Sequence, residues 1–155
     1  MEFATHSPLE TEQLAGLLAS ALRAGDVVTL SGGLGAGKTT FVRGVLRALG
    51  FGGRVLSPTY TLAAQYTIAD LDIYHFDAYL AEKQHQFLVE GGAELLFGKS
   101  ISFIEWPERL QIALPESRID ITISEGAEPN DRIFVVEGRG ERGKDLLLTN
   151  AEAAR

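Results

Sequence analysis

The sequence predicts an α/β fold built as one domain, in which helices flank a sheet with parallel strands. Short apolar runs at residues 27–30 and Ile101–Glu105 lack a polar face, as strands buried inside a parallel sheet do. Segments with helical spacing alternate with such runs, which is the order that α/β folds require. A chain of 155 residues with 45% hydrophobic residues suffices for one compact core but hardly for two.

Composition argues against several kinds of site. The chain has no cysteine and three scattered histidines, which excludes disulfides and thiolate chemistry and argues against a Cys- or His-rich metal centre. The net charge of −7 argues against broad binding of nucleic acid phosphates and favours a nucleotide or protein ligand. No apolar run approaches the roughly 20 residues that span a bilayer, and the N-terminus lacks the features of a signal peptide. We therefore expect a cytoplasmic protein without membrane contact.

The first half of the chain predicts helix, strand, loop and helix in that order. Ser7 can cap the first helix and Glu10 completes an S-x-x-E capping box, with Gly25 as the stop signal. The buried strand at residues 27–30 follows, and the chain then enters a glycine-rich stretch. Helical spacing resumes afterwards, and Gly50 supplies a left-handed stop.

The second half predicts strands at residues 54–57, 62–67, 70–77 and 101–105, with a helical stretch at residues 82–97. Isoleucines at 119, 121 and 123 alternate with polar residues, and a second run at 133–136 follows a turn-rich segment. This pattern predicts a C-terminal antiparallel edge hairpin with one solvent-exposed face. We expect residues 1–138 to form the domain and residues 139–155 to be a charged, Ala-rich tail without an assigned function.

Residues 32–39, GGLGAGKT, match the P-loop pattern G-x-x-x-x-G-K-[ST] between the expected buried strand and the amphipathic helix. Glycines bring backbone N–H groups against phosphate oxygens, and the helix that follows directs the positive end of its dipole at the same anions. Lys38 adds a charge for the β- and γ-phosphates, and the Thr39 hydroxyl can reach a magnesium ion bridging them. The motif predicts a nucleoside triphosphate site.

A P-loop site needs a carboxylate to hold the metal, and two acidic residues end apolar strands here. We expect Glu105 to be a metal ligand, directly or through water, and Asp77 to orient the attacking water or a second water. The sequence leaves open which acid is the direct ligand.

The segment SPTYT at residues 57–61 lies where switch loops of P-loop proteins pass the γ-phosphate. The hydroxyl of Thr59 or Thr61 would sense that phosphate or its metal, although an ordinary turn has a similar composition. Trp106 is either a core residue or, as we expect, a partly exposed contact beside the metal. Candidates for holding the base are residues 10–12 and Arg132.

Missing motifs narrow the class of protein. No N-K-x-D tetrapeptide occurs, so guanine selectivity is not supported and ATP is the default nucleotide. The region after Asp77 carries no arginine-bearing lid, which makes a small-molecule P-loop kinase the alternative and not the first interpretation. A nucleotide-gated binding module without meaningful turnover is a third possibility.

The motifs GLGAGKTTF, SPTYT, YHFDAY and IEWPERL, in this order, resemble the TsaE family, formerly YjeE, over roughly residues 5–138. These are small bacterial ATPases required for the threonylcarbamoyl modification of adenosine 37 in ANN-decoding tRNAs. The resemblance implies a P-loop NTPase-like three-layer fold with a mixed, mostly parallel sheet, helices on both faces and the C-terminal antiparallel hairpin. It also implies slow ATP hydrolysis, with Mg²⁺, that resets the TsaB–TsaD complex. The protein would be an accessory ATPase and not the transferase, and tRNA would touch it only through that complex.

Carried over by position, the resemblance assigns each site residue a role. Asp77, Lys38 and Thr59 act in hydrolysis, with Tyr60 in the switch, and Thr39 and Glu105 coordinate magnesium. The residues that contact the phosphates are Leu34, Gly35, Ala36, Gly37, Lys38, Thr39 and Thr40.

Two positions depart from the family pattern. Gly33 stands where the family usually has Asp, and Leu80 stands where it usually has Arg. Neither departure removes a phosphate or metal group, but the second puts in doubt any charge-assisted contact that the arginine makes within the Asp77 loop or to the partner complex.

Overall fold

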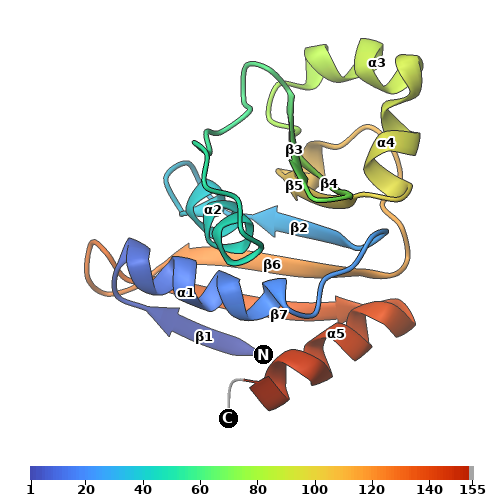
Figure 1. The fold of residues 1–155 in the computed structure, drawn as a ribbon. Helices are drawn as coiled ribbons and strands as arrows, with labels where there is room; N and C mark the ends of the chain where they lie inside the picture. The colour runs from blue at the N-terminus through green and yellow to red at the C-terminus, as the bar shows by residue number, and fades with distance from the viewer. Residues whose placement is uncertain (154–155) are drawn as a thin grey trace.

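A computed structural model describes residues 1–153, with side chains described as far as Thr149. Seven strands form one mixed sheet in the order β1-β7-β6-β2-β5-β4-β3 (Figure 1). The strands are β1 (Glu2–Thr5), β2 (Val27–Ser31), β3 (Ala63–Ile68), β4 (Leu71–Asp77), β5 (Ile101–Glu105), β6 (Arg118–Glu125) and β7 (Arg132–Arg139). The four central strands β4, β5, β2 and β6 are parallel, and the outer pairings are antiparallel. The α/β fold and its mixed sheet are confirmed, with parallel pairing confined to the centre.

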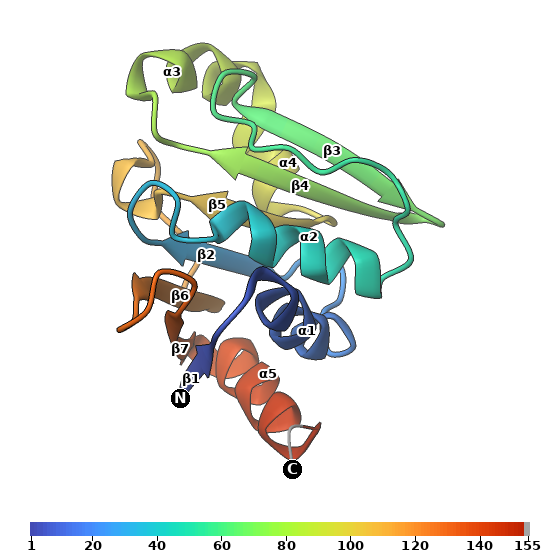
Figure 2. The same cartoon turned by 90° about the vertical axis from the view of Figure 1, so that its left-hand side faces the viewer.

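Helices cover both faces of this sheet. They are α1 (Pro8–Ala19), α2 (Lys38–Ala48), η1 (Ala81–Lys83), α3 (Gln84–Phe87), η2 (Leu88–Gly92), α4 (Ala93–Phe97), η3 (Pro107–Arg109) and α5 (Gly140–Ala153). Helices α1, α2 and α5 share one core with the sheet, whereas Leu96 of α4 packs into a separate core on the opposite face. Figure 2 shows α2 and α4 on opposite sides of the sheet. None of the helices formed by residues 1–153 is both long and apolar enough to cross a membrane.

The first helix is capped much as the sequence predicts. Ser7 accepts a hydrogen bond from the backbone N–H of Glu10 at 3.2 Å, and the Glu10 carboxylate accepts one from the N–H of His6 at 2.9 Å. The reciprocal bond of the capping box therefore reaches one residue further back than expected. The helix ends at Ala19, ahead of Gly25, whose φ of 95° belongs to the turn that leads into β2. The left-handed stop at Gly50 is confirmed by its φ of 99°.

The strand predicted at residues 54–57 is wrong. Strand β3 pairs antiparallel with β4 and occupies the edge of the sheet. Residues 54–57 therefore have no strand to pair with, and they form part of the loop between α2 and β3. Their one buried side chain is Val55, whose carbonyl accepts a hydrogen bond from Arg43. Two apolar residues between Gly53 and Pro58 are too few to specify a strand.

The hairpin of β6 and β7 is antiparallel, but its predicted place at the edge is wrong. Strand β6 pairs parallel with the central strand β2, and β7 pairs with β1, which the sequence analysis missed. The edge strand β1 has only four residues, and the N-terminal ammonium of Met1 donates to the carbonyl of Val136 at 2.8 Å. Ile119, Ile121 and Ile123 fill the covered face of β6, as their alternation predicts.

Two further segments differ from the prediction. The helical stretch expected at residues 82–97 is broken, because Glu90 and Gly91 leave the helical region, Gly91 with a φ of 96°. Residues 139–155 received no predicted structure, yet residues 140–153 form α5, which buries Leu146 in the main core. Arg142 also joins α5 to the turn before β2 through Asp26 at 2.8 Å.

Candidate nucleotide-binding site

The glycine-rich loop joins β2 to α2, and its backbone needs glycine at several positions. Gly35 and Gly37 have φ values of 75° and 105°, and Gly37 precedes the first turn of α2. A Cβ atom at Gly32 would lie 2.6 Å from the carbonyl oxygen of Ile123, so no larger residue fits there. Beside Gly35 and Gly37 the space within 4 Å is open. Backbone N–H groups at the positive end of α2 thus border a free space, which is the geometry of an anion site.

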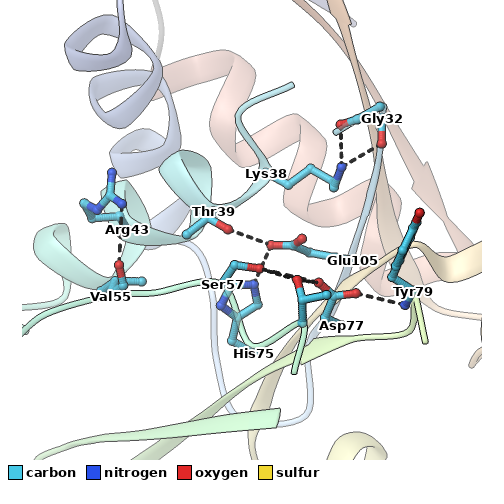
Figure 3. A network of polar contacts seen from close by, with 12 residues as sticks. Gly32, Lys38, Thr39, Arg43, Val55, Ser57, His75, Asp77, Tyr79 and Glu105 are labelled. Atoms are coloured by element: carbon cyan, nitrogen blue, oxygen red, sulfur yellow. Dashed lines mark hydrogen bonds and ion pairs between the residues drawn. The ribbon is translucent and has the colours of Figure 1, made fainter. Parts of the chain in front are cut away.

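Lys38 lies in the first turn of α2 and is 5% exposed. Its ammonium donates to the carbonyl oxygens of Gly32 at 2.6 Å and Gly33 at 2.7 Å (Figure 3). The same ammonium lies 4.3 Å from the ring centre of Trp106. Burial lowers the pKa of Lys38, and the nearby carboxylates of Glu105 and Asp77 oppose that shift. The charge is therefore already held inside the loop by acceptors that a phosphate group could replace.

Glu105 ends β5 and is 3% exposed. Its Oε1 accepts hydrogen bonds from the Thr39 hydroxyl at 3.1 Å and from Nε2 of His75 at 2.7 Å (Figure 3). Its Oε2 accepts none from the described residues, and Glu105 lines the same hollow as the P-loop. A carboxylate and a hydroxyl side by side, with a carboxylate oxygen still available, fit a hard cation such as Mg²⁺.

Asp77 ends β4 and lies opposite Glu105 in the sheet register. Its Oδ2 accepts a hydrogen bond from the Thr59 hydroxyl at 2.7 Å, and its Oδ1 accepts one from the backbone N–H of Tyr79 at 2.9 Å. Ser57 also donates toward Oδ2 at 3.5 Å. Asp77 thus uses both oxygens within the protein, in contrast to Glu105, and it anchors the segment SPTYT through two hydroxyls (Figure 3).

Trp106 follows Glu105 and is the N-cap residue immediately before η3. It has a left-handed backbone with φ of 56°, which is uncommon for a residue other than glycine. Its partly buried ring packs 5.0 Å from the ring of Tyr79, and the Arg109 guanidinium lies 5.3 Å from the ring centre. The ring also packs against the core on the α4 face while lining the hollow, so the two alternatives for Trp106 both describe part of its position.

The residues predicted to bind the phosphates or the metal, or to act in hydrolysis, all line one hollow. Its walls are Leu34, Gly35, Ala36, Gly37, Lys38, Thr39, Thr40, Ser57, Thr59, Asp77, Glu105 and Trp106. Thr61, the alternative to Thr59, instead lines a separate hollow beside α3. The structure brings these side chains together, while the role of each stays a prediction.

A second hollow adjoins the first and shares Gly35, Gly37 and Thr40 with it. Arg132 lines it, and its guanidinium donates to the carbonyl oxygens of Ala36 at 3.0 Å and Gly35 at 3.2 Å. Thr11 is the member of residues 10–12 that lines this hollow, whereas Glu12 forms ion pairs with arginines of α2.

Sequence reasoning missed two features of the site. Asn130, in the turn before β7, lines the second hollow, and nothing in its local sequence signals this. His75 received no role, although the sequence offers a signal: it lies two residues before Asp77 and therefore on the same face of β4.

Three comparisons bear on this chain. The family model described as threonylcarbamoyl adenosine biosynthesis protein TsaE matches residues 5–133. A curated tRNA threonylcarbamoyladenosine biosynthesis protein TsaE from Bacillus subtilis is 36% identical over 133 residues, covering 86% of this chain and 83% of the relative. A Rickettsia conorii protein of the same name is 36% identical over 145 residues, covering 92% and 82%. The crystal structure of Bacillus subtilis YdiB superposes with a TM-score of 0.84 at 30% identity, covering 100% of this chain and 96% of that one.

Proposed function

The chain belongs to the TsaE family and so to the biosynthesis of threonylcarbamoyladenosine in tRNA, and from this premise we propose that it binds ATP with Mg²⁺ and hydrolyses it slowly. We propose further that it acts as an accessory ATPase on the TsaB–TsaD complex at position 37 and is not itself the transferase. Its contact with tRNA would be indirect, through that complex, and it would work in the cytoplasm.

The observation that carries the proposal is the meeting of four separate segments at one hollow. The P-loop, the switch segment at residues 57–61, the end of β4 and the end of β5 each contribute polar groups. In P-loop proteins these parts divide the work between phosphate binding, metal binding and positioning of the attacking water. A glycine-rich turn without a ligand would not require two buried carboxylates beside a buried lysine.

The phosphates would be held by the backbone N–H groups of residues 34–40 and by Lys38. Phosphate oxygens would take the place of the Gly32 and Gly33 carbonyls as acceptors for the Lys38 ammonium. The exchange leaves the buried charge partnered both before and after binding.

Magnesium would be held by the Thr39 hydroxyl and by Glu105, whose Oε2 has no donor among the residues that the structure describes. A bound Mg²⁺ neutralises charge that develops on the phosphate oxygens. Sites that supply only one or two protein ligands and take the rest from phosphates and water are the usual kind for this ion.

Asp77 would orient the attacking water, with Thr59 coupling it to the switch segment through their 2.7 Å hydrogen bond. Because both oxygens of Asp77 already accept hydrogen bonds, its direction is fixed before a ligand binds. We assign the direct metal contact to Glu105 on this difference between the two acids.

The base and ribose would extend into the second hollow, which is continuous with the P-loop through Gly35 and Gly37. Arg132, Thr11 and Asn130 offer polar contacts there. Thr11 is 2% exposed and bonded to Thr5, so its wall of the hollow is rigid.

Two exposed side chains support a protein partner. Leu34, which lines the hollow of the P-loop, is 74% exposed, and Tyr60 of the switch segment, which lines the hollow beside α3, is 81% exposed. Large apolar side chains at that exposure could be covered by TsaB or TsaD. The net charge of −7 agrees with a protein, and not nucleic acid, as the main contact.

The test measures phosphate release from γ-labelled ATP with and without TsaB and TsaD, and it also searches for a labelled small acceptor. We expect little release from the protein alone and more with both partners. Labelled acceptor without partner stimulation would identify a kinase instead. No release in either condition, with ATP still bound, would identify a nucleotide-gated binding module.

A pair of variants on β4 makes the test specific to the site. Asp77→Asn should keep ATP affinity and lose hydrolysis, because the neutral amide cannot orient the attacking water as the carboxylate does. Asp72→Asn is the matched control, since Asp72 lies on the same strand but bonds Thr67 outside the hollow. Unchanged turnover in Asp77→Asn would remove Asp77 from the mechanism.

A further inference from the structure

His75 is a fully buried side chain in the middle of β4, at 0% exposure, and the described part of the chain supplies a partner to only one of its ring nitrogens. Nε2 lies 2.7 Å from Oε1 of Glu105. Nδ1 is buried and has no hydrogen-bond partner among the described residues. Buried polar atoms of a side chain are usually satisfied, so a ring that leaves one unpartnered needs a reason for its presence.

The pairing determines which nitrogen carries the hydrogen. A carboxylate oxygen only accepts, so Nε2 must donate to Glu105. Nδ1 is then a lone-pair acceptor without a donor. The opposite tautomer would place two lone pairs against each other and would leave an N–H buried without a partner, which is rarer in proteins than an unsatisfied acceptor.

The hydrogen bond also selects one oxygen of Glu105. The Thr39 hydroxyl and His75 both donate to Oε1, so the carboxylate is held from two directions. Oε2 receives no hydrogen bond from the described residues. Figure 3 shows both bonds reaching the same oxygen of Glu105. The ring therefore fixes the rotation of the carboxylate and leaves its second oxygen for another ligand.

We propose that His75 is a positioning residue for the metal site, whose Nε2–H holds Oε1 of Glu105 so that Oε2 is presented to Mg²⁺. The inference rests on the proposed function, because it requires the nucleotide to bind with magnesium through Glu105. Partners that orient a metal ligand in this way are typically worth 10- to 100-fold in metal affinity or activity.

Packing alone is the competing explanation, since His75 fills space beside Phe103 in the sheet register. A packing role depends on volume and not on a donor at the position of Nε2. Two substitutions separate these requirements. His75→Gln keeps an amide N–H that can reach the position of Nε2, whereas His75→Leu keeps a buried side chain without any donor.

The experiment titrates ADP into each purified full-length protein by calorimetry, first in excess EDTA and then over a series of Mg²⁺ concentrations. ADP is the probe because it binds without turnover. For His75→Leu we expect a rise of roughly 10- to 100-fold in the Mg²⁺ concentration that gives half of the full effect on ADP affinity. The ADP affinity of this variant in EDTA should stay within about twofold of wild type. In His75→Gln the same Mg²⁺ concentration should lie within about threefold of the wild-type value. His85→Leu, an exposed histidine of α3, is the matched control and should match wild type.

The outcomes separate the inference from its premise. Wild-type protein that binds ADP with no dependence on Mg²⁺ would overturn the proposed function and this inference together. A clear dependence in the wild type that His75→Leu leaves unchanged would overturn the inference alone. Equal loss of ADP affinity in EDTA and in Mg²⁺ would assign His75 to packing and would also overturn it.

A second measurement needs neither metal nor a variant that folds. Long-range proton–nitrogen NMR spectra of the metal-free protein with labelled histidine report which ring nitrogen carries the hydrogen. We expect His75 to show the tautomer protonated at Nε2 only. A hydrogen on Nδ1 instead would contradict the positioning role.

Discussion

Replacing Arg142 with alanine should destabilise the whole domain, although residue 142 lies in the segment that the sequence left outside it. The Arg142 guanidinium donates to both oxygens of Asp26, at 2.9 and 2.8 Å, and to the carbonyl of Ala21 at 2.8 Å. The Asp26 side chain is 4% exposed. In the variant its carboxylate would keep, among the described donors, only the backbone N–H of Arg23.

The expected loss of unfolding free energy follows from the burial of the Asp26 side chain. Removing one partner of a buried ion pair costs about 3–5 kcal/mol, and because the Arg142 side chain is 19% exposed we expect the lower end, about 3 kcal/mol. In a domain of this length that corresponds to a fall in melting temperature of roughly 6–12 °C. Urea unfolding at neutral pH, followed by circular dichroism, would measure the free energy of unfolding.

A matched control uses another arginine near the same end of the chain. The Arg139 side chain is 52% exposed, and its partner Asp120 keeps a second arginine, Arg118, in Arg139→Ala. An exposed pair of this kind is worth at most about 1 kcal/mol. If Arg142→Ala costs no more than Arg139→Ala, the Arg142–Asp26 pair does not join α5 to the domain as described, and the reasoning from Asp26 is wrong.

Three further predictions concern the site, the helices and pH. Nucleotide binding should change the fluorescence of Trp106, since its ring lies 4.3 Å from the Lys38 ammonium; an unchanged spectrum at saturating ATP would contradict this placement. Gly44→Ala should destabilise by about 1–3 kcal/mol in urea unfolding, because a Cβ would lie 2.5 Å from a carbonyl oxygen of α1; a gain, as helix propensity alone predicts, would refute the clash. The hydrogen bond with Asp131 raises the pKa of His6 above 6.5, and the same bond lowers the pKa of Asp131 below 3.8. The stabilisation that comes from the raised pKa of His6 is complete below pH 6.5 and is lost as pH rises through the pKa of His6 in the folded protein. The stabilisation that comes from the lowered pKa of Asp131 is complete above pH 3.8. Wild type should therefore exceed His6→Gln in thermal stability between those pH values and match it at pH 9; an equal difference at both would sink the assignment.

The parts of the fold that the sequence predicted are those with strong local signals. Strands β2 and β5 are apolar runs without a polar face, and the P-loop between β2 and α2 has a spacing that few other structures share. Gly50 marks a helix end because it adopts a conformation that other residues avoid. Each of these depends on residues adjacent in the chain.

The parts that failed depend on pairing between distant segments. Whether residues 54–57 form a strand was decided by β3 taking the place beside β4, which no local pattern reveals. Strand β1 is too short to show a period, and it forms because β7 offers a free edge.

The candidate site likewise has features that local sequence patterns predict and features that depend on contacts between distant segments. The P-loop and the two strand-ending acids could be named in advance, since each follows an element with a clear pattern. The difference between the acids could not, because it arises from side-chain partners: Asp77 uses both oxygens and Glu105 only one. The sequence predicted no role for His75, because a single histidine in an apolar strand indicates no site until the face of the strand on which it lies is known.

The left-handed backbone at Trp106 places a local cost on a residue whose ring has two contacts. A side chain in this conformation costs about 1–2 kcal/mol that glycine would not. Glycine would remove the packing of the ring on Tyr79 and on the core of the α4 face, and it would also remove the ring that faces Lys38. A library randomised at this codon should therefore keep a large side chain when heat resistance is the only demand, and keep the tryptophan when survival requires the nucleotide.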